Sequence, residues 1–137
     1  ANFVLRIVGK KKVTTAMGLI GYIVSIPVFA DSGFVILSSL NRALTKKAKL
    51  SLAGTAIALS LGLTATHTMV PPTPGPIAAA GIIDADLGLV ILFGMVTSFF
   101  GLIIPIFFAY DAGKKVYIDS NPENEPEESK VSAESEI

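Results

Sequence analysis

Two long apolar stretches dominate the chain, and each is interrupted in its middle by polar residues, proline and glycine. In the first, residues 13–40, the interruption carries Pro27, Asp31 and Gly33. Proline and glycine end helices, so each apolar flank is shorter than the roughly 20 residues that cross a hydrocarbon core. Basic residues, which mark cytoplasmic ends, precede and follow this stretch. The pattern therefore predicts a re-entrant helical hairpin; a single kinked crossing is the alternative, and it would leave a basic cluster outside.

The second apolar stretch, residues 50–83, is interrupted at residues 71–76, where four of six residues are proline. Such a run cannot be helix interior, so we predict a discontinuous transmembrane helix whose second part starts at Ile77. Unwound backbone inside a bilayer is tolerated only where it is buried in protein or lines a wet cavity. The break is therefore expected to face something polar.

Two sets of residues fall on different faces of the first part of that helix. Small residues recur every fourth position, at Gly54, Ala58 and Gly62. This spacing lets another helix approach closely. Hydroxyl and imidazole side chains occupy a second face, at Ser60, Thr64 and His67. The spacing predicts that one face packs against a neighbour and that the other lines a pathway.

Residues 87–110 form an uninterrupted span, about 36 Å long as a helix. Pro105 is a candidate kink within it. Asp84 and Asp86 precede the span, where capping of its first turn is the expected role. Residues 113–137 are rich in Glu, Ser and Pro, which predicts a disordered acidic cytoplasmic linker or tail.

The predicted architecture is an all-α polytopic membrane protein whose membrane domain covers residues 13–112. Residues 1–12 would be the end of an upstream helix and a basic cytoplasmic loop. The chain begins with Ala1 and not Met, so we expect further membrane segments upstream. The basic segments predict the path of the chain through the membrane. The hairpin enters from the cytoplasm and returns to it, the broken helix crosses to the outside, and the last helix crosses back to the cytoplasm.

Composition supports the membrane class and removes several others. The chain has 137 residues, of which 51% are hydrophobic and 16% charged, and its mean hydropathy is +0.64. Its net charge is zero and it has no global basic patch, so we expect no nucleic-acid partner. It has no cysteine and one histidine, which excludes a thiolate or His-rich metal site. No phosphate-binding loop, dinucleotide fingerprint or hydrolase motif occurs, so we expect no cofactor and no enzymatic activity.

Asp31 and His67 are the candidate proton-coupling residues. A carboxylate at membrane depth marks a functional site by default, although Asp31 is equally placed to cap the helix that follows it. An imidazole exchanges protons in the physiological pH range, and His67 stands beside the proline break. The structural alternative for His67 is a hydrogen bond to a carbonyl that the break leaves free. Protonation of Asp31 would favour the binding of an anionic substrate and so couple proton uptake to anion uptake.

Residues around the two breaks are the candidates for substrate binding. Exposed amides at a helix start attract anions, and one helix start is expected at the hairpin tip and another after the proline break. Hydroxyl groups on either side of the histidine add hydrogen-bonding capacity. Simple unwinding by the prolines, with Thr73 solvated, is the structural alternative at the second break. The candidates are Ser32, Gly33, Thr66, Thr68, Thr73 and Gly75.

The two breaks resemble a known family. Residues 25–37 (SIPVFADSGFVIL) and 66–76 (THTMVPPTPGP) are similar to segments of the gluconate permease family of proton symporters, and residues 84–88 (DADLG) resemble a third segment. The similarity covers residues 3–110. It implies half of an inverted-repeat transporter, because full-length members have two inverted repeats and this chain resembles a fragment of the first.

The resemblance implies a secondary active transporter that imports gluconate or a related hydroxylated carboxylate by proton symport across the cytoplasmic (inner) membrane. Its partners would be the carboxylate, protons, the lipid bilayer and the rest of the transporter. Thr73 replaces a family histidine, and Ala30 and Ser32 flank Asp31 where the family often has other residues, so the identity of the acid stays open. Alternatives are a permease for another organic acid or D-serine, and a non-transporting truncated subunit. A membrane enzyme that uses His67 and Asp31 would lack a nucleophile or metal.

Overall fold

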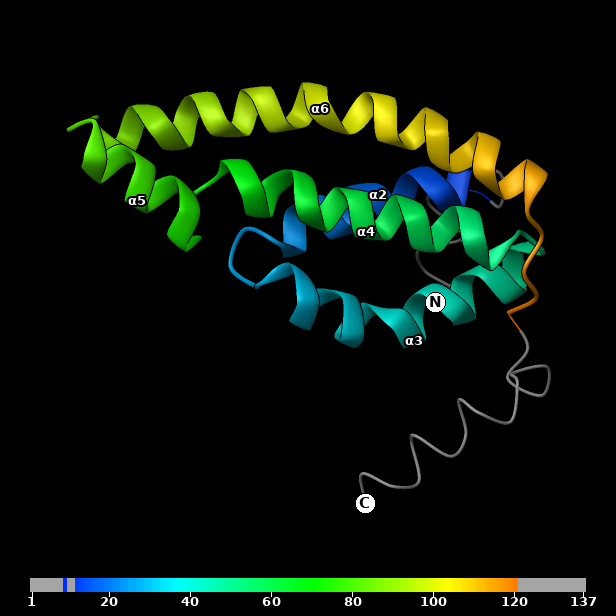
Figure 1. Cartoon of the computed structure of the whole chain (residues 1–137). Coiled ribbons are helices and arrows are strands. Elements are labelled where there is room, and N and C mark those ends of the chain that lie inside the picture. Colours follow the sequence, from blue (N-terminus) through cyan, green and yellow to red (C-terminus); the bar gives the residue numbers. More distant parts are fainter. Residues whose placement is uncertain (1–8, 10–11, 121–137) are drawn as a thin grey trace, which may run out of the picture.

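The computed structural model describes Gly9 and residues 12–120, and all regular structure in that part of the chain is helical (Figure 1). Two stretches within it, Leu52–Ile82 and Leu87–Lys115, are long and apolar enough to cross a membrane. The predicted all-helical class, with apolar helices of spanning length, is confirmed for these residues. The helices are α2 (Val13–Val24), α3 (Ala30–Ala48), α4 (Leu52–Met69), α5 (Pro74–Ile82) and α6 (Leu87–Lys115).

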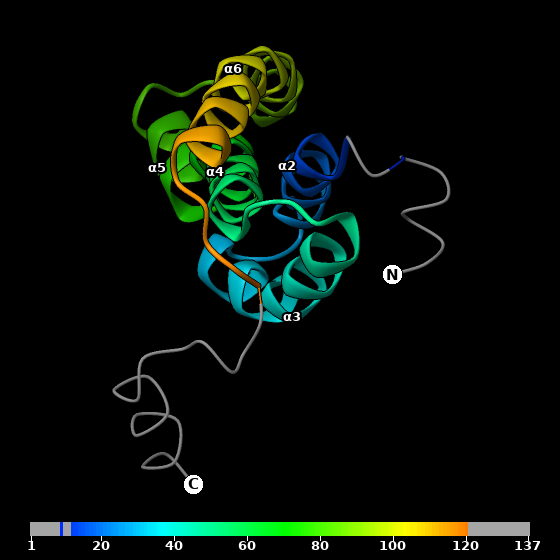
Figure 2. The ribbon, with the colours of Figure 1, turned by 90° about the vertical axis from the view of Figure 1, so that its right-hand side faces the viewer.

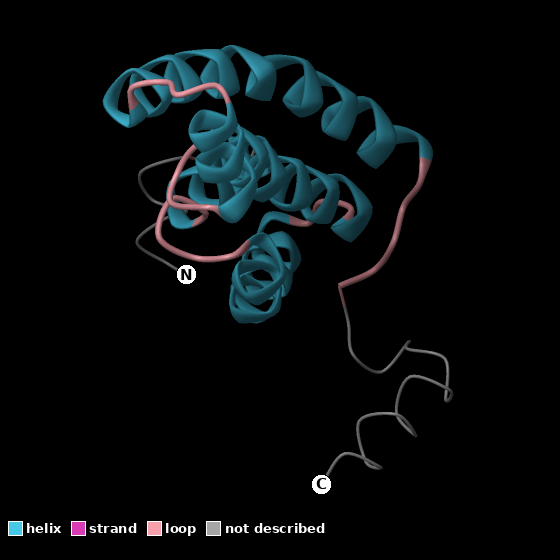
Figure 3. Ribbon diagram, turned by 60° about the vertical axis from the view of Figure 1, so that its left-hand side comes forward, coloured by secondary structure: helices cyan, strands magenta, loops and turns pink. Residues whose placement is uncertain are grey.

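Helix α4 lies at the centre of the bundle, between α2, α3 and α6 (Figure 2). Short loops join the helices at their ends, so the chain runs back and forth along one direction (Figure 3). α2 and α3 turn back on one another, and α5 extends beyond the loop that joins them (Figure 1). The α2–α3 hairpin therefore covers only part of the length of α6.

Small residues allow α4 to lie directly against its neighbours. A Cβ atom added to Gly62 would overlap the backbone oxygen of Gly18 in α2. One added to Gly54 would lie 2.9 Å from the backbone oxygen of Ala109 in α6, and Ala58 is also buried. The close approach that the small-residue spacing predicts is therefore confirmed, on two different neighbours.

Larger apolar side chains fill the space between α2, α3 and α4. Met17, Leu44 and Leu59, one from each of these helices, are fully buried in a common cluster. In a bilayer such contacts stabilise through close packing, because lipid tails are as apolar as leucine and provide no hydrophobic driving force. The three helices thus form one packed unit.

Helix α3 continues beyond residue 40, where the sequence pattern ended the second arm of the hairpin. It extends to Ala48, and this added part packs against the bundle through the buried residues Asn41, Leu44 and Thr45. The hydroxyl oxygens of Thr45 and Thr55 in α4 lie 2.7 Å apart. The apolar pattern did not show this continuation, because two of the residues buried in it, Asn41 and Thr45, are polar.

Two further helix ends differ from the sequence prediction. α5 begins at Pro74 and not at Ile77, since proline is tolerated in a first turn, where N–H groups have no helical partner. α6 continues past residue 110 to Lys115, whose ammonium lies 2.6 Å from the carboxylate of Asp111 one turn earlier.

The segment after α6 is tied to the start of α4. The hydroxyl of Ser51 donates to the oxygen of Val116 (2.7 Å) and accepts from the amide of Ile118 (3.1 Å). These residues are held in place, although they fall within the predicted disordered tail at 113–137. The predicted upstream helix end and the rest of the tail lie outside the described residues, which omit 1–8, 10–11 and 121–137.

Candidate functional site

The two sequence breaks lie next to each other in the structure. The loop between α2 and α3 (residues 25–29) and the break between α4 and α5 (residues 70–73) meet at a cavity of about 80 Å³, which is lined by residues 26–29, Pro72 and Thr73. The ring of Phe29 also meets the imidazole of His67 edge-on, with ring centroids 5.8 Å apart. Together these two segments form what is called the break region below.

Threonine hydroxyls satisfy carbonyls that the breaks leave without a helical partner. The last carbonyls of a helix lack intrahelical donors. Near the end of α2 the hydroxyl of Thr66 donates to the oxygen of Tyr22 (2.9 Å), and after α4 the hydroxyl of Thr73 donates to the oxygen of Val70 (2.8 Å). Both threonines are buried. Thr66 therefore joins α4 to α2, and Thr73 holds the turn into α5 and is not solvated.

His67 makes no such bond. Its Nδ1 atom is buried and has no hydrogen-bond partner among the described residues, and the same holds for the hydroxyl of Ser25 in the α2–α3 loop. The bond from His67 to a freed carbonyl, which the sequence left open, is therefore not observed in the described chain. Unpartnered buried polar atoms are uncommon in folded proteins, and here two of them flank the break region.

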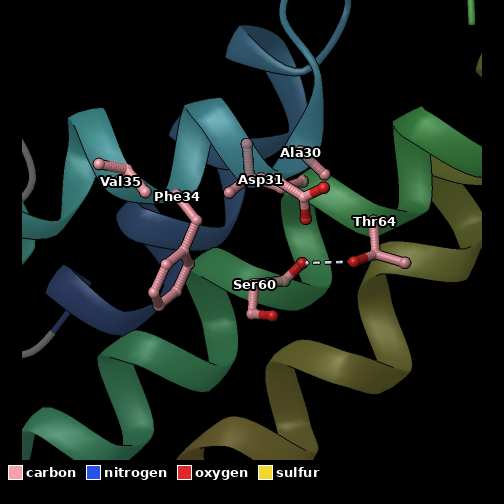
Figure 4. A pocket seen from close by; sticks show the side chains of 7 residues that line it. Ala30, Asp31, Phe34, Val35, Ser60 and Thr64 are labelled. Atoms are coloured by element: carbon pink, nitrogen blue, oxygen red, sulfur yellow. Dashed lines mark hydrogen bonds between the residues drawn. The ribbon is translucent and has the colours of Figure 1, made fainter.

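Asp31 lies in the first turn of α3 but does not cap it. Phe29 holds the N-cap position without a side-chain hydrogen bond, so the capping role that the sequence left open is not observed. The carboxylate of Asp31 is exposed and has no hydrogen bond or ion pair within the described chain. It points toward Ser60 and Thr64 of α4 across a cleft of about 400 Å³ (Figure 4).

Close packing holds the start of α3 against α4. Gly33 is buried, and a Cβ atom added there would lie 2.8 Å from Cδ2 of Leu63. The amide of Gly33 donates to the oxygen of Phe29 (2.8 Å), which closes the first turn. The amides of residues 30–32 precede that bond and have no intrahelical acceptor. Since Ser32 is exposed, this helix start is a place where an anion can bind.

The start of α5 offers fewer donors. Gly75 has open space around it, but its neighbours Pro74 and Pro76 carry no N–H. Thr68 is exposed one turn before the break, and its hydroxyl donates to the oxygen of Thr64 within the same helix (2.9 Å). Of the two predicted helix-start sites, the one at α3 therefore presents more free amides.

The structure separates the predicted site residues into groups. Asp31 and Ser32 lie at the cleft, His67 and Thr73 lie at the break region, and Thr66 is buried on the packing side of α4. Sequence reasoning placed Ser60 and Thr64 on a polar face of α4 without assigning them to the site. Their spacing was the available signal, and only the seating of α3 on α4 shows that they face the carboxylate.

The remaining predictions concern the turn before α6 and metal binding. The carboxylate of Asp86 accepts from the amide of Leu89 (3.0 Å), so the predicted cap is confirmed. Asp84 adopts a left-handed conformation, with φ of 53°. Pro105 lies inside α6, which Figure 1 shows as one continuous, curved helix. The described residues contain no cluster of three or more side chains suited to hold a metal.

Comparison with known proteins identifies relatives along the whole chain. Residues 1–137 match the model of the GntP family permeases. The chain is 42% identical to an uncharacterized permease of Haemophilus influenzae, over 81% of this chain and 23% of that protein. It is 38% identical to a gluconate permease of Pseudomonas aeruginosa (72% and 22%) and 34% identical to the inner membrane permease YgbN of Escherichia coli (85% and 26%). No solved structure matches it.

The chain spans about a quarter of the length of these relatives. They are permeases, which carry solutes across membranes and are not enzymes. The family match, the apolar helices of spanning length and the relatives named as permeases agree with one another. The resemblance inferred from the two breaks is confirmed, and this chain belongs to the GntP family of permeases.

Proposed function

We propose that this chain contributes to a secondary active transporter that imports gluconate or a related hydroxylated carboxylate by proton symport across the cytoplasmic membrane. The observation that carries the proposal is the meeting of the two breaks, with Phe29 of the hairpin loop against His67 of the broken helix. Secondary transporters commonly build substrate and ion sites from discontinuous helices near the bilayer midplane. The relative named as a gluconate permease supports the substrate class.

In this proposal the α2–α3 hairpin is re-entrant from the cytoplasm. α2 has 12 residues, or about 18 Å, which is well short of the ~30 Å hydrocarbon core. The hairpin loop stops short of the far end of α6, and α5 extends past this loop (Figure 1). Lys12, Lys49 and Lys115 adjoin the start of α2 and the ends of α3 and α6, all at one end of the bundle. The positive-inside rule makes that end cytoplasmic.

Asp31 and His67 would exchange the coupled proton. The carboxylate of Asp31 and the Nδ1 atom of His67 have no partner in the described chain, so both are available to accept one. Protonation of Asp31 would remove a negative charge beside the free amides at the start of α3. The substrate carboxylate would bind there, with Ser32 and Gly33 at the same turn.

The second side of the site would come from α4 and α5. Thr68 and Gly75 are exposed, and Thr66 and Thr73 already hold carbonyls at the breaks. A substrate hydroxyl could replace such a carbonyl as the acceptor when the helices shift during transport. The second inverted repeat of the complete transporter would close the site.

Uptake of labelled gluconate tests the proposal, in cells that lack their own gluconate uptake and express the reading frame containing this chain. We expect accumulation that a protonophore collapses, with a sodium-free medium as the control. Accumulation that the protonophore does not reduce would rule out proton symport. If gluconate fails but another hydroxylated acid accumulates, that acid is the substrate within the proposed class. If only D-serine accumulates, the substrate class is wrong. If gluconate, other hydroxylated acids and D-serine all fail to accumulate, the transport proposal is wrong.

A further inference from the structure

We propose that Ser60 and Thr64 of α4, opposite Asp31, form a subsite for the hydroxyl groups of the transported acid. The inference rests on the proposed function, because it assigns one part of the substrate to one wall of the site. The cleft between these residues holds about 400 Å³, within the ~300–1,000 Å³ typical of small-molecule sites. Its walls come from the start of α3 and the middle of α4 (Figure 4).

The polar groups of the cleft differ in what they can offer a ligand. The hydroxyl of Thr64 donates its hydrogen to the backbone oxygen of Ser60 (2.9 Å), so its lone pairs are left to accept. The hydroxyl of Ser60 has no partner in the described chain and can donate as well as accept. The carboxylate of Asp31 only accepts when it is ionised, and when it is protonated it adds one donor and keeps acceptor capacity. Acceptors therefore outnumber donors in this cleft in both states of Asp31.

The excess of hydrogen-bond acceptors over donors indicates which part of the substrate suits the cleft. No Lys, Arg or His lines the cleft, so no side chain there neutralises a carboxylate. The complementary group is a chain of hydroxyls, each of which donates one hydrogen bond and accepts another. Phe34 and Leu63 line the same cleft and suit the C–H face of a carbon chain. The substrate carboxylate would point away from Ser60, toward the free amides at the start of α3.

An ammonium group is the rival ligand chemistry, since a carboxylate and two hydroxyls also suit the amino group of an amino acid. The two ligands differ in how binding scales with the number of hydroxyls. Gluconate carries a polyol chain, whereas glycerate is a much shorter hydroxy acid and D-serine carries an ammonium group. A subsite for hydroxyls favours gluconate over both, and a subsite for an ammonium favours D-serine.

The test measures KM for uptake of gluconate, glycerate and D-serine by Ser60→Ala and Thr64→Val in the complete protein. Loss of one hydrogen bond is expected to raise KM for gluconate about fivefold to tenfold, and KM for glycerate less than about twofold. Thr64→Ser, which keeps the hydroxyl, should retain the wild-type KM. Ser38→Ala is the matched control, because the Ser38 hydroxyl donates to the oxygen of Val35 in its own helix (2.7 Å) and Ser38 does not line this cleft.

Each outcome has one meaning. Wild-type protein that accumulates none of the three substrates overturns the proposed function, and the inference falls with it. Normal gluconate uptake with unchanged KM in both variants overturns the inference alone. An equal rise in KM for gluconate and glycerate also overturns it, since the removed hydroxyl would then not be bonding to the longer polyol chain of gluconate. A rise confined to D-serine assigns the subsite to an ammonium group instead.

Discussion

The two faces of α4 differ in what they touch, although both consist of small, hydroxylated and aliphatic residues. On one face, Gly62 lies against the backbone of α2, Gly54 against α6, and the hydroxyl of Thr66 bonds to a carbonyl of α2. On the other, Ser60 and Thr64 are exposed at a cleft opposite a carboxylate. The first face has no room for one added carbon atom, and the second has room for a ligand.

This difference shows that residue type alone does not assign a role to a threonine in such a helix. Thr66 and Thr64 are two positions apart, which is about half a turn, so they point to opposite sides. The hydroxyl of Thr66 bonds across to another helix, whereas that of Thr64 bonds within its own. We therefore expect substitutions on the packing face to reduce folded protein, and substitutions on the open face to change transport.

The largest expected effect is the loss of folded protein in Gly62→Ala. The added Cβ would overlap the backbone oxygen of Gly18, and its other nearest atoms are also backbone atoms of Gly18, so the helices must separate. Overpacking of this kind costs about 1–3 kcal/mol, and occasionally more, and a clash with rigid backbone lies at the upper end of that range. The measurement is the amount of protein in the membrane and its thermal unfolding in detergent. Gly101→Ala in α6 is the matched control, because nothing lies within 4 Å of a Cβ atom there. Equal effects of the two would refute the close approach.

Asp31→Asn and His67→Ala come next, and they should abolish proton-driven uptake while the amount of protein in the membrane stays unchanged. Neither side chain makes a hydrogen bond that holds the described helices together. The measurement is uptake of labelled substrate with and without an imposed proton gradient. Both variants retaining gradient-driven uptake would remove these residues from proton coupling and leave the transport function itself standing.

A smaller effect is expected from comparing Thr66→Val with Thr64→Val. Valine has the shape of threonine without its hydroxyl, so the comparison isolates one hydrogen bond at each site. Thr66→Val leaves the buried carbonyl of Tyr22 without a donor, which costs about 1–3 kcal/mol. Thr64→Val removes an exposed bond within one helix and should change the free energy of unfolding by less than about 0.5 kcal/mol. Equal destabilisation would contradict the distinction between the faces.

Tyr22→Phe should destabilise the bundle less than Gly62→Ala does. The hydroxyl of Tyr22 donates to the oxygen of Met95 (2.8 Å) and lies 3.0 Å from that of Ser98, linking α2 to α6. Loss of this group should lower the free energy of unfolding by about 1 kcal/mol, because Ser98 keeps its own bond to Met95. Thermal unfolding in detergent measures the change. No change in unfolding would mean that α2 and α6 are held together without this contact.

Hydropathy alone did not show which helix is central. Leu52–Ile82 and Leu87–Lys115 are both long and apolar enough to cross a membrane. Within the 18-residue apolar window of each stretch, 44% is buried inside the bundle in the first and 17% in the second. The more apolar helix is the more exposed one. In a bilayer, apolar surface suits lipid as well as it suits protein, so small and polar residues mark the contacts between helices.

The sequence by itself determined the helical class, the two breaks, the small-residue face of α4 and the cap at Asp86, because each depends on neighbours along the chain or on helical spacing. The segments around both breaks also identified the family, which the match to the GntP permease model confirms. The tertiary structure alone decided that α3 continues to Ala48 and that Thr66 serves α2. It also decided that Asp31 faces Ser60 and Thr64. These outcomes depend on how one helix is seated on another, which Gly33 and Leu63 set through contact and not through sequence spacing.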